Sequence, residues 1–127
     1  MANGLAGIMM AAVGVFHEAA GLLIYRAPLA EMLGAGLVNT VLPNLDPAHH
    51  GRQAAFWFLV AGPVLVMLGA LATWAERRAG TLPRWLGWSL LVLTIIGTAT
   101  FPNSAFWALF VPAFILIRDS RRTGAAL

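Results

Sequence analysis

Residues 3–25 read NGLAGIMMAAVGVFHEAAGLLIY, an apolar stretch long enough to cross a bilayer as a helix. Two ionisable residues, His17 and Glu18, interrupt it. Small residues allow the backbone of a second helix to approach closely, so a side rich in them is expected to face protein and not lipid. Read at heptad spacing, one side of this helix carries mostly small residues together with the glutamate: Gly4, Gly7, Ala11, Gly14, Glu18, Gly21 and Tyr25.

Glu18 is the leading candidate for a functional residue. An isolated charge near the middle of a membrane costs roughly 2.5–3.5 kcal/mol or more, so the carboxyl group there must be protonated, paired or in contact with trapped water. The structural alternative is a packing hydrogen bond to Thr94 or Thr98. His17 points about 100° away from Glu18 on a helix. It either borders the same cavity as a partner of Glu18 or bonds a backbone carbonyl.

The composition indicates a membrane protein of one domain, residues 1–127. Hydrophobic residues make up 60% of the chain and charged residues 10%, and the mean hydropathy is +0.80. The absence of cysteine excludes disulfides, thiolate metal sites and iron–sulfur clusters, and we expect no metal and no cofactor. The basic residues are all arginine, and most lie beside apolar stretches, so nucleic acid is not an expected partner.

Four apolar stretches predict an all-α bundle of four transmembrane helices at about 3–25, 54–75, 82–101 and 104–117. Arginines gather in the connection 76–84 and in the tail after residue 117, which four spans place on one side. The excess of positive charge predicts that both termini are cytoplasmic. The tryptophans fall near the predicted ends, as an aromatic belt does, with Trp57 and Trp107 outside and Trp74, Trp85 and Trp88 inside.

The outer connection, residues 26–53, is expected to hold a short interfacial helix over 27–42 and then a turn-rich polar segment. That segment concentrates Asp46, His49, His50 and Arg52 above the first span. The histidines could relay protons or bind a metal or haem, but their spacing matches no strong zinc pattern, and a solvated loop is the alternative. Arg26 and Arg52 could counter Glu18, hold an anionic head group or extend to the interface.

A short internal repeat accompanies these spans. Residues 53–57 read QAAFW and residues 103–107 read NSAFW, and each copy is followed by a proline, Pro63 or Pro112. Two similar hairpins would be related by an axis along the membrane normal, an arrangement in which binding sites form between the halves. The alternative is that both copies are interfacial aromatic anchors.

The chain resembles small bacterial four-helix membrane proteins of uncharacterised function. The resemblance rests on AFWF at 55–58, on Leu82-Pro83 with Leu86-Gly87, and on FPNSAFW at 101–107. It implies a multi-pass protein integral to the bacterial cytoplasmic membrane. These motifs are structural, and the resemblance carries no chemistry.

The favoured functional hypothesis is a membrane-embedded enzyme that acts by general acid/base chemistry on a lipophilic small molecule, through isomerisation, epoxide opening or cyclisation. Glu18 and His17 are its expected catalytic residues. The candidate proton relay consists of Asp46, His49 and His50. The candidate substrate-binding residues are Tyr25, Arg52, Trp57, Thr94, Thr98 and Trp107.

Two alternatives use the same helices, because a fold does not fix a function. One is a proton-coupled transporter working as a homodimer, by analogy with small multidrug transporters, which also carry one glutamate in the first of four helices. The strong arginine asymmetry of this chain counts against a dimer that faces both ways. The other is a non-catalytic membrane subunit or lipid-binding module, in which Glu18 stabilises assembly.

Overall fold

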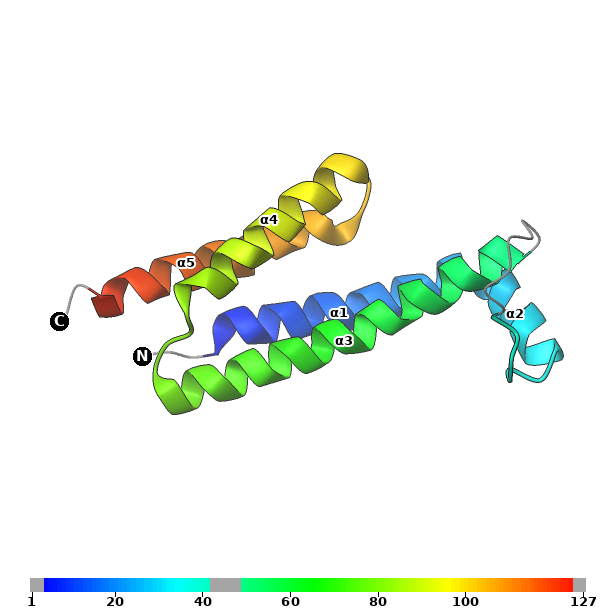
Figure 1. The fold of residues 1–127 in the computed structure, drawn as a ribbon, viewed down its shortest axis with the longest axis horizontal. Helices are drawn as coiled ribbons and strands as arrows, with labels where there is room; N and C mark the ends of the chain where they lie inside the picture. The colour runs from blue at the N-terminus through cyan, green and yellow to red at the C-terminus, as the bar shows by residue number, and fades with distance from the viewer. Residues whose placement is uncertain (1–3, 42–48, 125–127) are drawn as a thin grey trace. The chain divides into compact units, whose positions relative to one another are not determined.

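The computed structural model describes residues 4–41 and 49–124, with side chains described as far as residue 119. The described chain is all-α and contains no strand (Figure 1). Its elements are, in order, α1 (Leu5–Ile24), α2 (Arg26–Gly34), α3 (His50–Ala79), α4 (Arg84–Thr100), the 3-10 helix η2 (Ala105–Leu109) and α5 (Phe110–Gly124). The predicted all-α class is therefore confirmed.

Two helices, not the expected four, are long and apolar enough to cross a membrane within the described residues. They are α1, with 20 residues, and α3, with 30 residues. The third expected span is the 17-residue helix α4, which is about 25 Å long and thus shorter than a hydrocarbon core of about 30 Å. The fourth is divided between η2 and the 15-residue α5, whose last turns carry charge from Arg118 onward. Length and composition therefore do not establish these two as spans.

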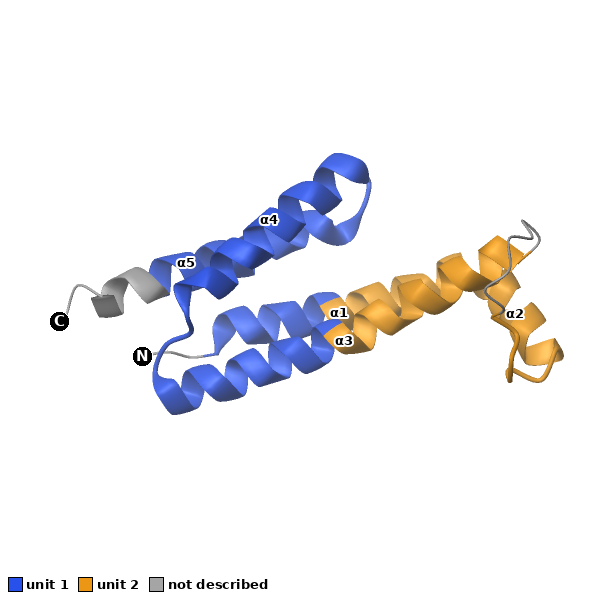
Figure 2. Ribbon diagram, viewed as in Figure 1, with its two compact units in different colours: residues 1–13, 65–127 blue, residues 14–64 orange. Residues whose placement is uncertain are grey.

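The chain forms two compact units, residues 1–13 with 65–127 and residues 14–64 (Figure 2). Both α1 and α3 contribute to each unit. In the first unit, α4 packs along α5, and buried apolar side chains join these helices to the start of α1: Ala6, Met10, Leu90, Leu109, Ala113 and Leu116. The side of α4 that faces this packing carries Gly87, Leu90, Thr94, Gly97 and Thr98. The small and polar residues of the third apolar stretch are thus buried together.

Glycines bring α1 and α3 together in the first unit. A Cβ atom added at Gly69 would lie 2.5 Å from the Ala11 nitrogen and 2.5 Å from the Gly7 carbonyl oxygen. A Cβ at Gly7 would in turn meet the backbone of α3 at Gly69 and Thr73. The hydroxyl of Thr73 donates to the Gly4 carbonyl oxygen at 3.3 Å and to the Gly69 carbonyl oxygen at 2.9 Å. The predicted packing side of α1 is therefore confirmed here.

The interfacial helix is shorter than predicted. It ends at Gly34, because Gly36 takes a left-handed conformation (φ 87°) that closes the helix. The Gly36 amide donates to the Leu33 carbonyl at 3.1 Å, and the Leu37 amide donates to the Met32 carbonyl at 2.9 Å, the pair of bonds of a Schellman motif. Within α2 Met32 is buried, whereas Leu33 and, after the helix, Leu37 are exposed.

The two copies of the short repeat adopt different conformations. Residues 53–57 belong to the α-helical first turns of α3, whereas Ala105, Phe106 and Trp107 form the 3-10 helix η2. Ser104 caps η2 by accepting a hydrogen bond from the Phe106 amide at 3.4 Å. At this level the copies are not structurally equivalent.

Candidate functional site

Glu18 packs against the backbone of α3 in the second unit. A Cβ added at Gly62 would meet Oε2 of Glu18 and would lie 3.1 Å from the Gly14 carbonyl oxygen. Gly62 therefore has no room for a side chain because the carboxyl group of Glu18 occupies that space. One turn further along α1, a Cβ at Gly21 would lie 2.8 Å from the ring of Phe58 and 2.9 Å from Leu59. The expectation that Glu18 faces protein is confirmed for this oxygen.

The Oε2 atom of Glu18 is buried and has no hydrogen-bond partner in the described chain. Buried polar atoms of native proteins normally have one, so an exception requires an explanation. Pro63 follows the contacting glycine inside α3. Because proline has no N–H, it donates no helical hydrogen bond to the Leu59 carbonyl. Oε2 of Glu18 therefore lies beside the proline-containing turn of α3 without a hydrogen-bond partner in the described chain.

Glu18 lies at the border between the packed and the exposed sides of α1. As a whole its side chain is partly buried, between fully buried glycines and exposed aliphatic residues. Its neighbours one turn away on the exposed side are Val15, 61% exposed, and Leu22, 53% exposed. The side chain of Glu18 therefore lies next to the exposed apolar surface of α1.

His17 is held by α3 and is not turned toward Glu18. Its Nε2 donates to the Phe58 carbonyl oxygen at 3.0 Å. Its ring stacks on the Phe58 ring, with centroids 3.9 Å apart and 12° between the planes. Because a carbonyl can only accept, Nε2 must carry the proton. The interpretation of His17 as a residue that bonds a backbone carbonyl is therefore confirmed, and the hydrogen bond fixes its ring.

Tyr25 joins the same aromatic cluster, with its ring centroid 5.2 Å from that of Phe58. Phe58 thus contacts both His17 and Tyr25. The sequence analysis named Phe58 only as part of the AFWF motif at 55–58. Because Phe58 follows Trp57 directly, the two side chains point to different sides of the helix. Trp57 itself is 68% exposed and contacts Phe56 edge to face.

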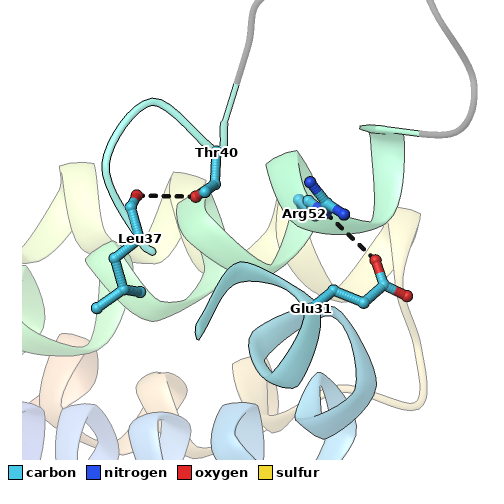
Figure 3. Close-up of polar contacts among 4 residues, drawn as sticks. All are labelled: Glu31, Leu37, Thr40 and Arg52. Atoms are coloured by element: carbon cyan, nitrogen blue, oxygen red, sulfur yellow. Dashed lines mark hydrogen bonds and ion pairs between the residues drawn. The ribbon is translucent and has the colours of Figure 1, made fainter. Parts of the chain in front are cut away.

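Arg52 pairs with Glu31 and not with Glu18. Its Nε donates to Oε2 of Glu31 at 3.2 Å, which ties the start of α3 to α2 (Figure 3). Beside it, the Thr40 hydroxyl donates to the Leu37 carbonyl oxygen at 2.9 Å and closes the turn after α2. Of the roles left open for Arg52, the structure therefore does not show a counter-charge to Glu18, and its predicted contact with substrate stays a prediction.

This exposed ion pair should contribute little to stability. We expect Glu31→Gln to lower the free energy of unfolding by about 0.2–1 kcal/mol, since solvent screens both side chains. The same change made in an Arg52→Gln background should cost nothing further. Chemical unfolding of the four proteins in detergent measures the coupling, and a coupling well above that range would show a buried, structural pair.

The other candidate residues are distributed over both units. His50 is exposed at the first residue of α3, His49 precedes it in a partly buried position, and Asp46 lies outside the described residues. Among the described residues, no three histidine or acidic side chains gather as a metal site would require. The relay of Asp46, His49 and His50 remains a prediction.

Thr94, Thr98 and Trp107 belong to the first unit. The Thr94 hydroxyl is fully buried and donates to the Leu90 carbonyl of its own helix at 2.7 Å. The Thr98 hydroxyl is buried without a partner in the described chain. The Trp107 indole donates to the Pro102 carbonyl oxygen at 2.8 Å and is otherwise exposed. Their predicted substrate contacts remain predictions.

Glu76 is a buried acid that the sequence analysis did not single out. It is only 5% exposed, and its Oε2 has no hydrogen-bond partner in the described residues. It follows the apolar stretch 54–75, at the end of α3. Burial, and to a smaller extent the nearby charge of Asp119, raises the pKa of the Glu76 carboxyl group. The sequence analysis placed it only at the start of the connection 76–84.

The raised pKa gives stability a definite pH dependence. The folded chain binds a proton at Glu76 more tightly than the unfolded chain, so this stability is fully present below the unfolded pKa and is lost as pH rises through the folded pKa. Glutamine cannot ionise, so Glu76→Gln should stabilise the protein more at pH 8 than at pH 4. Thermal unfolding at both pH values measures this, with Glu31→Gln as the control. Equal effects at both pH values would contradict it.

Comparison with known proteins identifies the family of the chain, and the function of that family is unknown. The model of DUF6463, described as a family of unknown function, matches residues 1–123. No curated protein and no solved structure matches the chain. The resemblance to an uncharacterised family is thereby confirmed, and the role of the site has to be argued from its geometry.

Proposed function

We propose that this chain, which belongs to the family of unknown function DUF6463, is a membrane-embedded protein whose Glu18 performs acid–base chemistry on a lipophilic small molecule. The observation that carries the proposal is the unpartnered, buried Oε2 of Glu18 against Gly62, at the edge of an exposed apolar surface.

The location in a membrane is supported by where the apolar side chains lie. In the most apolar 18-residue stretch of α1 only 22% is buried, and in that of α3 only 17%. The core helix of a soluble protein is, by contrast, mostly buried. On α4, a row of large aliphatic residues is exposed: Val92, Leu93, Ile95 and Ile96. Water-exposed apolar surface of this extent is unfavourable for a soluble monomer.

The proposed topology has four membrane helices and cytoplasmic termini. In this topology α4 forms one span, and η2 together with α5 forms another. Because these helices are short, they tilt little and the bilayer is thinner around them. Cation–π contacts near the end of α3 and at the start of α4 support an interface there. The Arg78 guanidinium lies 5.2 Å from the Trp74 ring centroid, and that of Arg84 lies 6.0 Å from the Trp88 ring centroid. Tryptophan and arginine are both favoured at the boundary between lipid and water.

The chemistry that a single carboxyl group supports best is isomerisation. The His17 ring is bonded to the Phe58 carbonyl and the Arg52 guanidinium to Glu31, so neither supplies Glu18 with a second catalytic group. Epoxide hydrolysis needs one group to protonate the oxygen and another to activate water. A shift of a double bond needs only one group, which removes a proton from one carbon and returns a proton to another. We therefore favour a double-bond isomerase over the other two reactions.

The proposal is tested by following deuterium from solvent into lipophilic molecules. Membranes with and without the protein are incubated in D₂O, and the organic extract is analysed by mass spectrometry and fragmentation. A protein-dependent isomer that carries one deuterium on the carbon that has left the double bond, next to the shifted double bond, supports the proposal. The membranes are taken from cells that make their own full set of lipids. Identical extracts with and without the protein would argue against the proposal.

A further inference from the structure

A groove of about 580 Å³ in the first unit combines apolar walls with two exposed arginines. Its walls come from the start of α1 and from the second half of α3, and it is lined by Ile8, Ala11, Ala70, Thr73, Trp74, Arg77 and Arg78. This groove lies in a different unit from Glu18 and plays no part in the chemistry proposed for that residue. We propose that it binds an anionic phospholipid, with the phosphate on Arg77 and Arg78 and an acyl chain along the aliphatic wall.

Charge is the first argument. Arg77 and Arg78 are exposed, and neither forms an ion pair with a carboxylate in the described part of the chain. The acids nearest in sequence or space do not neutralise them. Glu76 is buried, with a raised pKa, and Asp119 accepts from Arg118 Nε at 3.1 Å. Two guanidinium groups without a carboxylate partner, both lining the groove, attract a phosphate diester. A guanidinium can bind a phosphate through two parallel hydrogen bonds.

The walls supply the second argument, because they select a lipid over a soluble phosphate. Ile8, Ala11 and Ala70 present only aliphatic atoms, and the Thr73 hydroxyl is turned to backbone carbonyls of Gly4 and Gly69. The polar surface of the groove is therefore concentrated at the arginines. Trp74 lies between the two regions and holds the Arg78 guanidinium over its ring, as an interfacial tryptophan would. Basic pockets between helices at the cytoplasmic face are typical sites for anionic head groups.

The inference rests on the membrane location proposed above, and it does not depend on the acid–base role of Glu18. Native mass spectrometry of the whole protein in neutral detergent tests it, with phosphatidylglycerol and phosphatidylcholine of identical acyl chains as the probes. We expect the wild-type protein to prefer phosphatidylglycerol. The double change Arg77→Gln with Arg78→Gln should weaken that binding roughly tenfold to thirtyfold, from the usual contribution of a basic residue near an anionic lipid.

Arg84→Gln is the matched control, since Arg84 also lies over a tryptophan ring but does not line the groove. It should bind phosphatidylglycerol as the wild type does. Ala70→Phe fills the groove while it keeps both arginines, and it should lower binding of the lipid without changing the helix content. These two variants separate a shaped site from general attraction of anionic lipid to a basic end.

Three results would overturn the inference. The first is equal binding of the two lipids by the wild type, and the second is an equal loss of phosphatidylglycerol binding in Arg84→Gln. The third is displacement of phosphatidylglycerol by glycerol phosphate at similar concentration, which would indicate a site for free phosphate. Glu18→Gln is measured alongside and should bind lipid normally. Loss of lipid preference with intact chemistry at Glu18 would withdraw only this site, and the reverse result would withdraw only the acid–base role.

Discussion

Replacing Glu18 with glutamine is expected to lower the rate of protein-dependent isomerisation by a factor of about 10² to 10⁴, the usual contribution of a general acid or base. Glutamine keeps the size of the side chain and so keeps its contact with Gly62, but its amide cannot remove and return a proton. Deuterium incorporation into the product, measured in membranes that contain equal amounts of each protein, gives the two rates.

The control for this prediction is Glu31→Gln, which removes a carboxylate from the exposed surface of the same unit. It should leave the rate unchanged, as should Glu76→Gln in the other unit. If Glu18→Gln retained the wild-type rate while it folded and inserted normally, Glu18 would have no part in the reaction. The buried carboxyl group would then be a packing element of α1 and α3.

Substitution of Gly69 should have the largest effect on stability. Its Cβ would lie 2.5 Å from two backbone atoms of α1, the Ala11 nitrogen and the Gly7 carbonyl oxygen, and backbone atoms cannot rotate away as a side chain can. We expect Gly69→Ala to destabilise the protein by about 1–3 kcal/mol through overpacking, and Gly69→Leu to prevent the helices from meeting. Unfolding in mixed micelles with increasing SDS gives the change for Gly69→Ala.

Gly34 provides the comparison, because a Cβ at this position meets nothing within 4 Å. Gly34→Ala should be neutral or should stabilise α2 by up to about 1 kcal/mol, since alanine is the better helix former. If Gly69→Ala were as well tolerated as Gly34→Ala, α1 and α3 would not be packed through their glycines. The position of Glu18 against α3 would then lose its support.

The sequence predicted α1 and its packing side well, because both depend on local pattern. Glycines at heptad spacing mark a close helix contact wherever the partner is, and Gly7 and Gly21 do contact α3. The same reasoning placed Glu18 on that side. What the pattern could not supply is the partner atom, since Gly62 lies far away in the sequence and has no side chain that would mark it.

The features that the sequence did not reveal depend on tertiary contact or on backbone conformation. Arg52 and Glu31 meet because α2 lies beside the start of α3, and no local spacing predicts that pairing. Glu76 is adjacent to two exposed arginines, and nothing in the local sequence marks it as buried, whereas packing within the first unit buries it. The early end of α2 follows from Gly36, which adopts the left-handed conformation. The prediction had included this glycine in a helix over 27–42.

The most direct test of the account is covalent labelling of carboxyl groups in intact membranes. A hydrophobic carbodiimide partitions into lipid and modifies acids that it can reach there, whereas a charged, water-soluble carbodiimide modifies acids at the surface. We expect the hydrophobic reagent to modify Glu18, as located by fragmentation of the peptide, and the water-soluble reagent to modify Glu31 and leave Glu18 intact. Modification of Glu18 by the water-soluble reagent alone would contradict a site that is open to lipid and closed to water.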